Sequence, residues 1–209
     1  MRCPAGVLRS ALLACIAFAV SGCGTSPPVR YFTLASEPPS QTARGAEATM
    51  STYAISVGPV TVPELVDRPH LVLRTSATQV QVAELARWAA SLKSEIPRVI
   101  ADQLAHLLTG ASTGTSSQRA VSAPDYRVLV DIQRFDSTPG VSAEIEASWT
   151  VRARDGELLV GRSVAAEPSR PGYDELVAAH SRALGVVSRD IANAIVKLRA
   201  GPAPGAEPK

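Results

Sequence analysis

The second half of the chain alternates apolar and polar residues, a pattern typical of strands that bury one face. Within Tyr126 to Phe135, the residues Tyr126, Val128, Val130 and Ile132 share one face, and Val141 to Ala153 places an apolar residue at every second position, which is the side-chain period of a strand. Asp155-Gly156 follows, and both residues tolerate the positive φ of a tight turn. Leu158 to Ala166 then supplies the third strand. The pattern predicts a three-stranded antiparallel meander.

A helical spacing of apolar residues appears between Leu92 and Leu108. Such a stripe predicts a helix that packs one face against a sheet. Ser94 is the predicted N-cap, which places Pro97 in the first turn, where its missing N–H is tolerated. Gly110 stands where a helix-ending glycine is common. The stripe consists of Ile96, Val99, Ile100, Leu104, Leu107 and Leu108.

A second amphipathic helix is predicted from Tyr173 to Leu198, and His180 lies on its apolar stripe. A histidine in that position is expected to be a core or rim residue rather than a ligand. Shorter β-prone segments precede the first helix, and Gly58-Pro59 is expected to form a turn after one of them. These segments are Tyr31 to Leu34, Tyr53 to Val57, Leu71 to Leu73 and Val80 to Val82.

The order of elements is strands, helix, three longer strands, helix. Two amphipathic helices on one face of a mainly antiparallel sheet make a two-layer α/β sandwich of the α+β class. Ala35 to Met50 is expected to be a mobile loop, and Thr109 to Ser122 a linker of small residues. The length of 209 residues fits one domain, predicted to cover residues 31–199. Residues 200–209 are predicted to be a disordered tail.

The first 22 residues have the pattern of a bacterial lipoprotein signal peptide. Arg2 and Arg9 give it a basic start, and Ser10 to Val20 is an apolar run too short to span a bilayer. The residues that follow resemble a lipobox, in which the cysteine receives a lipid before cleavage in front of it. Its members are Val20, Ser21, Gly22 and Cys23. Acyl chains on Cys23 are therefore expected to hold the mature protein to a membrane.

The chain after Cys23 begins with a short extended tether, predicted at residues 23–30 from its two prolines. Gly24 follows the cysteine. By resemblance to lipoproteins of two-membrane bacteria, the lack of an aspartate there favours the inner leaflet of the outer membrane, with the domain facing the periplasm. Without Arg2 and Arg9 the charged side chains balance, which argues against a nucleic-acid partner. Cleavage also removes the other two cysteines, so no disulfide or cysteine-based metal site is expected.

Motifs of catalysis or metal binding do not stand out. His70, His106 and His180 are not spaced as metal ligands, and no phosphate loop, dinucleotide fingerprint or nucleophile elbow occurs. Glu144 and Glu146 share one strand face and could serve acid/base chemistry, although a solvated strand face is the simpler interpretation. We expect a binding or assembly protein without cofactor or metal. A periplasmic hydrolase is the alternative that the glutamate pair leaves open.

Short segments spread along the mature chain carry a resemblance to one known family. In order, they are Tyr31 to Leu34, Ile55 to Val60, Val62-Pro63, Asp67 to Pro69, Arg87 to Ala89, Arg127 to Asp136, Ala147 to Trp149, Leu176 to Ala179 and Ser188 to Ala192. Together with the lipobox they resemble the ABC-type transport auxiliary lipoprotein family, which includes PqiC-like lipoproteins. The family often has Glu-Pro where this chain has Ala90-Ser91.

The resemblance implies a partner rather than a reaction. Members are outer-membrane-tethered periplasmic domains that work with an inner-membrane ABC transporter. Its substrate-binding subunits carry the mammalian-cell-entry (MCE) domain and move lipids or hydrophobic compounds between membranes, which serves membrane integrity. Docking is the expected role, and self-association into a homo-oligomer is left open. Secretion, pilus and lipopolysaccharide-export machines are the alternative partners.

Arg87 and Trp88 are candidate partner contacts, because tryptophan and arginine are enriched at binding hot spots. The alternative is that Trp88 packs the corner between strand and helix while Arg87 is exposed. Tyr31 and Phe32 allow the same two interpretations, and as strand residues we expect them to lie in the core.

Overall fold

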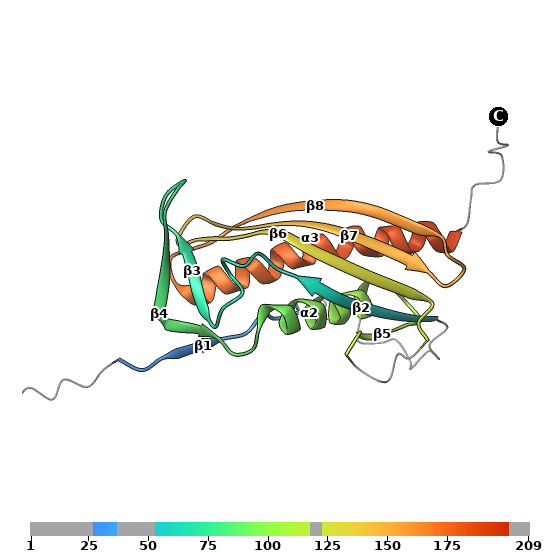
Figure 1. The fold of residues 1–209 in the computed structure, drawn as a ribbon, viewed down its shortest axis with the longest axis horizontal. Coiled ribbons are helices and arrows are strands. Elements are labelled where there is room, and N and C mark those ends of the chain that lie inside the picture. The colour runs from blue at the N-terminus through green and yellow to red at the C-terminus, as the bar shows by residue number, and fades with distance from the viewer. Residues whose placement is uncertain (1–26, 37–52, 118–122, 201–209) are drawn as a thin grey trace, which may run out of the picture.

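The computed structural model describes residues 27–36, 53–117 and 123–200 (Figure 1). Within these ranges the chain forms eight strands and two helices. They are β1 (Arg30–Phe32), β2 (Tyr53–Thr61), β3 (His70–Arg74), β4 (Val80–Trp88), α2 (Leu92–Leu107), β5 (Ala111–Thr115), β6 (Tyr126–Thr138), β7 (Ser142–Ala153), β8 (Leu158–Pro168) and α3 (Tyr173–Ala200).

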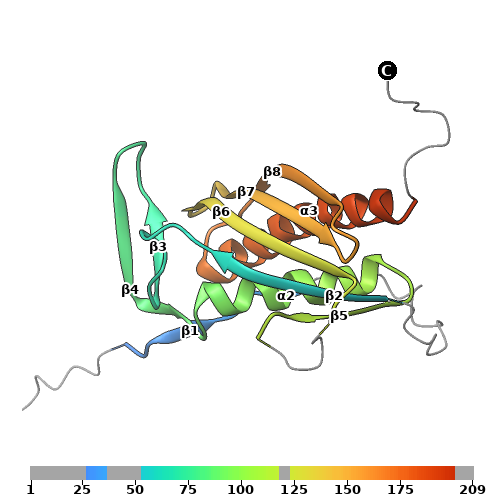
Figure 2. The ribbon, with the colours of Figure 1, turned by 45° about the vertical axis from the view of Figure 1, so that its right-hand side comes forward.

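The strands form two sheets, where the sequence suggested one. The larger sheet has the order β5-β2-β6-β7-β8, and the smaller has the order β1-β4-β3. Helices α2 and α3 pack against each other and against one face of the larger sheet (Figure 2). The β3–β4 hairpin projects at one end of the domain, and α3 ends at the other (Figure 1). The predicted α+β class, with both helices on one face, is confirmed.

The predicted meander is also confirmed; β6 and β8 extend beyond their predicted ends, and β7 begins one residue later than predicted. β6 pairs with β7 and β7 with β8, both antiparallel. Gly156 closes the second hairpin with a φ of 100°, a conformation that side chains rarely adopt. The inward faces of β6 and β7 form the middle of the core. Their residues Val128, Val130, Ile132, Ile145 and Val151 are at most 3% exposed.

Trp149 of β7 packs against β8 and is linked through Ser163 to α3. The Trp149 ring lies against Gly161, where an added Cβ would be 2.3 Å from ring carbon atoms. The indole N–H donates to Ser163 Oγ at 2.9 Å, and that hydroxyl donates to Asp190 of α3 at 2.6 Å. Since Trp149 and Ser163 are both buried, this chain of donors satisfies polar atoms that burial would otherwise penalise.

The expected turn at Gly58-Pro59 is wrong, because both residues lie inside β2. The register of β2 on β6 shifts between Val57 and Val60, where two residues of β2 oppose one of β6 and form a bulge. Gly58 has a φ of +112°, and a side chain there would also meet Ser116 Oγ at 2.7 Å. The glycine and proline therefore bend the strand without ending it.

The start of α2 differs from the prediction as well. Ser91 holds the N-cap position without a side-chain cap, and its carbonyl accepts hydrogen bonds from the amides of Ser94 and Glu95. Ser94 thus lies inside the helix, and Pro97 is an interior proline. Leu107 is 45% exposed rather than part of the buried stripe.

Other corrections concern segments without a clear pattern. The predicted linker after α2 contains the edge strand β5, which pairs in parallel with β2. Arg30, expected in the tether, begins β1, and Ala200, expected in the tail, ends α3. The remaining tail and most of the predicted mobile loop lie outside the described residues. Among the described helices, neither is long and apolar enough to cross a bilayer.

Candidate functional site

The predicted lipid site lies outside the part of the chain that the structure describes. This applies to the whole lipobox, Val20, Ser21, Gly22 and Cys23, so acylation of Cys23 stays a prediction. The described chain begins at Pro27 and enters β1 three residues later. The structure therefore describes how the domain holds the segment next to the predicted anchor.

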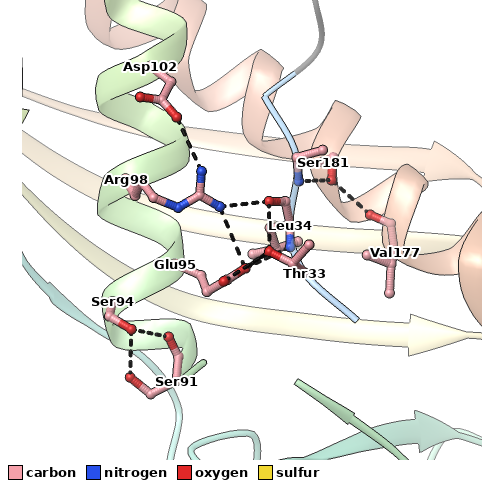
Figure 3. Close-up of polar contacts among 10 residues, drawn as sticks. Thr33, Leu34, Ser91, Ser94, Glu95, Arg98, Asp102, Val177 and Ser181 are labelled. Carbon is pink, nitrogen blue, oxygen red and sulfur yellow. Dashed lines mark hydrogen bonds and ion pairs between the residues drawn. The ribbon is translucent and has the colours of Figure 1, made fainter. Parts of the chain in front are cut away.

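This segment is bound by the first turns of α2 (Figure 3). The Leu34 N–H donates to a Glu95 carboxylate oxygen at 2.7 Å, and the Thr33 hydroxyl lies 3.0 and 2.9 Å from the two carboxylate oxygens. Arg98 donates to the Leu34 carbonyl at 2.9 Å. The same guanidinium lies 3.8 Å from Glu95 and 3.2 Å from Asp102. Both backbone groups of Leu34 are thus bound by charged side chains.

The opposite side of the segment is bound by α3 and β4. The Ala35 N–H donates to Ser181 Oγ of α3 at 3.1 Å, a contact also drawn in Figure 3. The Phe32 carbonyl accepts from the Ala89 N–H at 2.7 Å, just beyond the parallel pairing of β1 with β4. The Phe32 ring meets Tyr173 edge-on, with centroids 6.0 Å apart. We call residues 32–35 together with Glu95, Arg98 and Ser181 the anchor clamp.

The clamp depends on a buried carboxylate. The Glu95 residue is 6% exposed, and Leu34 is 1% exposed. A buried charge is costly unless it is paired and hydrogen-bonded, and here the partners come from the segment itself and from Arg98. The sequence carries one signal for this site. Glu95 shares helical spacing with Leu92, Ile96 and Val99, so it interrupts an otherwise apolar face.

The residues just before and inside the clamp alternate between solvent and core. Tyr31 is 65% exposed, so the expectation that it lies in the core is wrong. Phe32 is buried, as expected. The Arg30 guanidinium forms an exposed ion pair with Asp174 at 2.7 Å, a contact that contributes little to stability.

The two candidate partner contacts lie at the end of β4. Trp88 is 6% exposed, and its ring meets Phe135 edge-on at 6.1 Å. This burial favours the packing role for Trp88, while Arg87 is partly buried. A hollow of about 310 Å³ borders the tryptophan, and its lining includes Pro69, Ala89 and Leu92. A partner contact at this pair stays a prediction.

A second cleft, of about 430 Å³, opens where the β3–β4 hairpin meets β6 and β7. Arg74 reaches from the hairpin and donates to Asp136 at 2.8 Å, and this hydrogen bond raises the pKa of Arg74. Asp136 faces Glu144 across the ladder, and Arg134 lies 4.0 and 3.7 Å from these two carboxylates. Part of the opposite wall is apolar, formed by Pro63, Leu65 and Val66. Charged and apolar walls together suit contact with another protein.

The glutamate pair considered for acid/base chemistry is engaged in ion pairs. Glu144 lies near Arg134, and Glu146 pairs with Arg162. Such pairing is typical of a solvated strand face. Among the described residues, no group of three or more His, Cys, Asp or Glu side chains is placed to hold a metal ion.

His180 is a core residue, as predicted. It is completely buried and stacks on Phe135, with ring centroids 3.9 Å apart and planes 4° from parallel. Its Nε2 lies 2.7 Å from the Ser137 hydroxyl. Burial lowers the pKa of His180 to about 3, so the ring is neutral at physiological pH.

Comparisons with known proteins agree with the fold and identify the family. A crystal structure of an uncharacterized protein has a TM-score of 0.65 at 20% identity, covering 81% of this chain and 99% of the other. A crystal structure of a Xanthomonas campestris protein of the DUF330 family has a TM-score of 0.58 at 17% identity, covering 83% and 96%. No curated protein matches at a significant level. At such identities these likenesses concern the fold alone.

The family assignment comes from a family model. The model of the ABC-type transport auxiliary lipoprotein component matches residues 32–192, from the anchor clamp into the last helix. This confirms the resemblance drawn from the short segments of the sequence. The chain belongs to the ABC-type transport auxiliary lipoprotein family.

Proposed function

We propose that this protein is an outer-membrane-anchored periplasmic lipoprotein that serves as the docking subunit of an MCE-type ABC transport system. The cargo would be lipids or hydrophobic compounds that move between the membranes. Membership of the auxiliary family over residues 32–192 supports the transport role. The observation that supports the docking role is the anchor clamp, because it ties the segment next to the predicted lipid to the domain and would restrict the orientation of the domain at the membrane.

The tether is short enough for this orientation to matter. Seven peptide units separate Cys23 from Arg30, so the lipidated residue lies at most about 25 Å from β1 at ~3.5 Å per residue. The β1 strand adjoins β4 of the projecting hairpin, and α3 ends on the far side of the domain (Figure 1). The hairpin end would face the outer membrane, and the end of α3 would point into the periplasm.

The cleft beside Arg74 is the surface that we propose for the MCE subunit. Its walls combine ion pairs with an apolar loop, and it opens beside the β3–β4 hairpin, at the end of the domain that would face the outer membrane. Arg134 is 54% exposed at its rim, so Arg134→Glu, which reverses a rim charge, should slow association and weaken the complex. Arg152→Glu is the matched control, because Arg152 is an exposed arginine near the end of β7 that lies away from the cleft.

The first experiment tests the anchor itself. Cells that make the wild-type chain, Cys23→Ser or Cys15→Ser are labelled with radioactive palmitate, and the protein is immunoprecipitated. We expect label in the wild type and in Cys15→Ser, and no label in Cys23→Ser, which should also leave the membrane fraction. Label that persists in Cys23→Ser would contradict the anchor and, with it, the location.

The second experiment tests the partner. The protein is crosslinked in intact cells, purified with its membranes solubilised, and its partners are identified by mass spectrometry. We expect an MCE-domain subunit, recovered with the wild type and with Arg152→Glu but reduced with Arg134→Glu. Recovery of a secretion, pilus or lipopolysaccharide-export component in its place would reject the transport proposal and favour that machine.

A further inference from the structure

The larger sheet has a long edge strand that pairs on one side only. Within the described residues, β8 pairs with β7 alone, and it forms the outer margin of the sheet in Figure 1. Its pairing is regular from Leu158 to Pro168 with no register shift, whereas the β2–β6 and β6–β7 pairings both contain one. The edge is therefore long and unbroken.

The backbone groups that point away from β7 can be identified from the register. Hydrogen bonds join Ala153 N–H to the Glu157 carbonyl and Ser169 N–H to the Val141 carbonyl, and these bonds flank the two ends of the ladder. In an antiparallel pair, hydrogen-bonded and non-hydrogen-bonded positions alternate. The odd-numbered residues of β8 thus bond to β7, and the even-numbered ones present their N–H and C=O at the free edge. These are Leu158, Val160, Arg162, Val164 and Ala166.

The side chains of the same residues are exposed. Leu158, Val160 and Val164 are 54%, 62% and 66% exposed. Val160 also forms part of the wall of a hollow of about 250 Å³ on the outer face of the sheet, together with Leu129. Soluble proteins protect free edges with charged residues, especially lysine, or with proline, bulges or covering loops. Between Leu158 and Glu167, β8 has no lysine, proline or bulge, and Arg162 is the one charged residue among its five outward positions.

Charge decides between the two kinds of strand that could add to this edge. A second copy that used all five outward residues would pair antiparallel about Arg162, because this residue is at their centre. It would place the two Arg162 side chains directly opposite each other, which is destabilising for like charges. Arg162 is 61% exposed and has one acidic partner, Glu146, on β7. A foreign strand with an acidic residue opposite Arg162 avoids the repulsion.

We propose that β8 binds an extended segment of a partner protein as a sixth strand of the larger sheet. Main-chain hydrogen bonds to the five outward residues would supply the affinity. Apolar side chains opposite Val160 and Val164, with a carboxylate opposite Arg162, would supply the specificity. The inference goes beyond the transport assignment, because it concerns the form of the bound segment and applies to any partner machine.

A designed peptide tests this directly. The probe is a capped nine-residue peptide that alternates valine and threonine and carries glutamate at its centre, so that the glutamate faces Arg162. Amide hydrogen exchange is measured on the protein purified as the cell makes it, with and without peptide. At a peptide concentration ten times Kd, the amides of Val160, Arg162 and Val164 should exchange about tenfold more slowly. The amides of Gly161 and Ser163 already bond to β7 and should change little.

Proline variants test the same hydrogen bonds. Val164→Pro removes one outward N–H and leaves the bonds to β7 in place, so it should fold and lose most of the peptide binding. Val164→Thr is the matched control, because it keeps both the N–H and the branched side chain. Val160→Pro is a second outward position, used if Val164→Pro unfolds. Replacing the central glutamate of the peptide by lysine should weaken binding at least about threefold.

Three results would overturn the proposal. The first is peptide binding that both proline variants retain, since the edge would then not be the site. The second is protection spread over residues away from β8. The third is slow exchange of the outward amides in the protein alone together with a dimer in sedimentation, because a second copy would then occupy the edge.

Discussion

Lowering the pH should destabilise this domain through one buried histidine. His180 of α3 is completely buried against β6, where it stacks on Phe135 and lies close to the Ser137 hydroxyl. Burial lowers its pKa to about 3 in the folded state, whereas a histidine in the unfolded chain titrates near 6.5. Well above pH 6.5 neither state binds the proton, so the full stability is present. Below pH 6.5 the unfolded chain binds it first, and stability falls until the pH approaches 3.

The expected loss follows from proton linkage. Between pH 7 and pH 5 the unfolded state gains most of one proton and the folded state gains almost none, which lowers the free energy of unfolding by about 2 kcal/mol. Urea unfolding followed by tryptophan fluorescence at pH 7, 6 and 5 measures this change. His180→Gln removes the titrating ring and should flatten the dependence by the same amount, although it lowers stability at pH 7 because it replaces a stacked ring.

The control is His106→Gln, which also removes one histidine but from the exposed side of α2. This variant should keep the pH dependence of the wild type. The reasoning would be refuted if His180→Gln retained the full loss between pH 7 and pH 5. It would be refuted equally if the wild type were as stable at pH 5 as at pH 7.

Two further substitutions test the packing and the anchor clamp. Gly161→Ala should lower the free energy of unfolding by about 1–3 kcal/mol in urea titration, since its Cβ would lie 2.3 Å from Trp149; a variant as stable as the wild type would show that the ring can move freely. Glu95→Ala should cost about 1–3 kcal/mol and speed amide exchange at Leu34, because it removes the carboxylate that accepts this buried N–H. Asp102 also contacts Arg98, but its side chain is 47% exposed, so Asp102→Ala should change the free energy of unfolding by less than about 1 kcal/mol. Equal losses in Glu95→Ala and Asp102→Ala would contradict the clamp.

The sequence was most informative where a period extends over many residues. β7 alternates over its whole length, β6 alternates from Tyr126 to Ile132, and α3 keeps its stripe throughout its length. Both signals arise from burial of one face, which is also what the fold requires. Short segments carried less information. Tyr31 to Leu34 has four residues with apolar character at three of them, so the face that is buried could not be assigned from the sequence.

Elements that depend on distant partners were missed. β5 consists of alanine, serine, threonine and glycine, and its pairing with β2 rather than its own pattern makes it a strand. Gly58-Pro59 has the composition of a turn, yet the neighbouring strands hold it within a bulge. The contacts of Glu95 to Leu34 join residues 61 positions apart. Only the interruption of an apolar helix face indicated that this glutamate has a buried partner.

The anchor clamp also has a consequence for the time course of biogenesis. Ala35 bonds to Ser181, which lies 146 residues later, and Arg30 pairs with Asp174, which lies 144 residues later. At about 5–20 residues per second, synthesis takes roughly 7–30 s to reach these partners. Until then Ala35 and Phe32 lack the contacts that α3 supplies, which are the Ser181 hydroxyl and the Tyr173 ring. The stretch beside the predicted lipid is therefore among the last parts of the domain to become fixed, although it is among the first to be made.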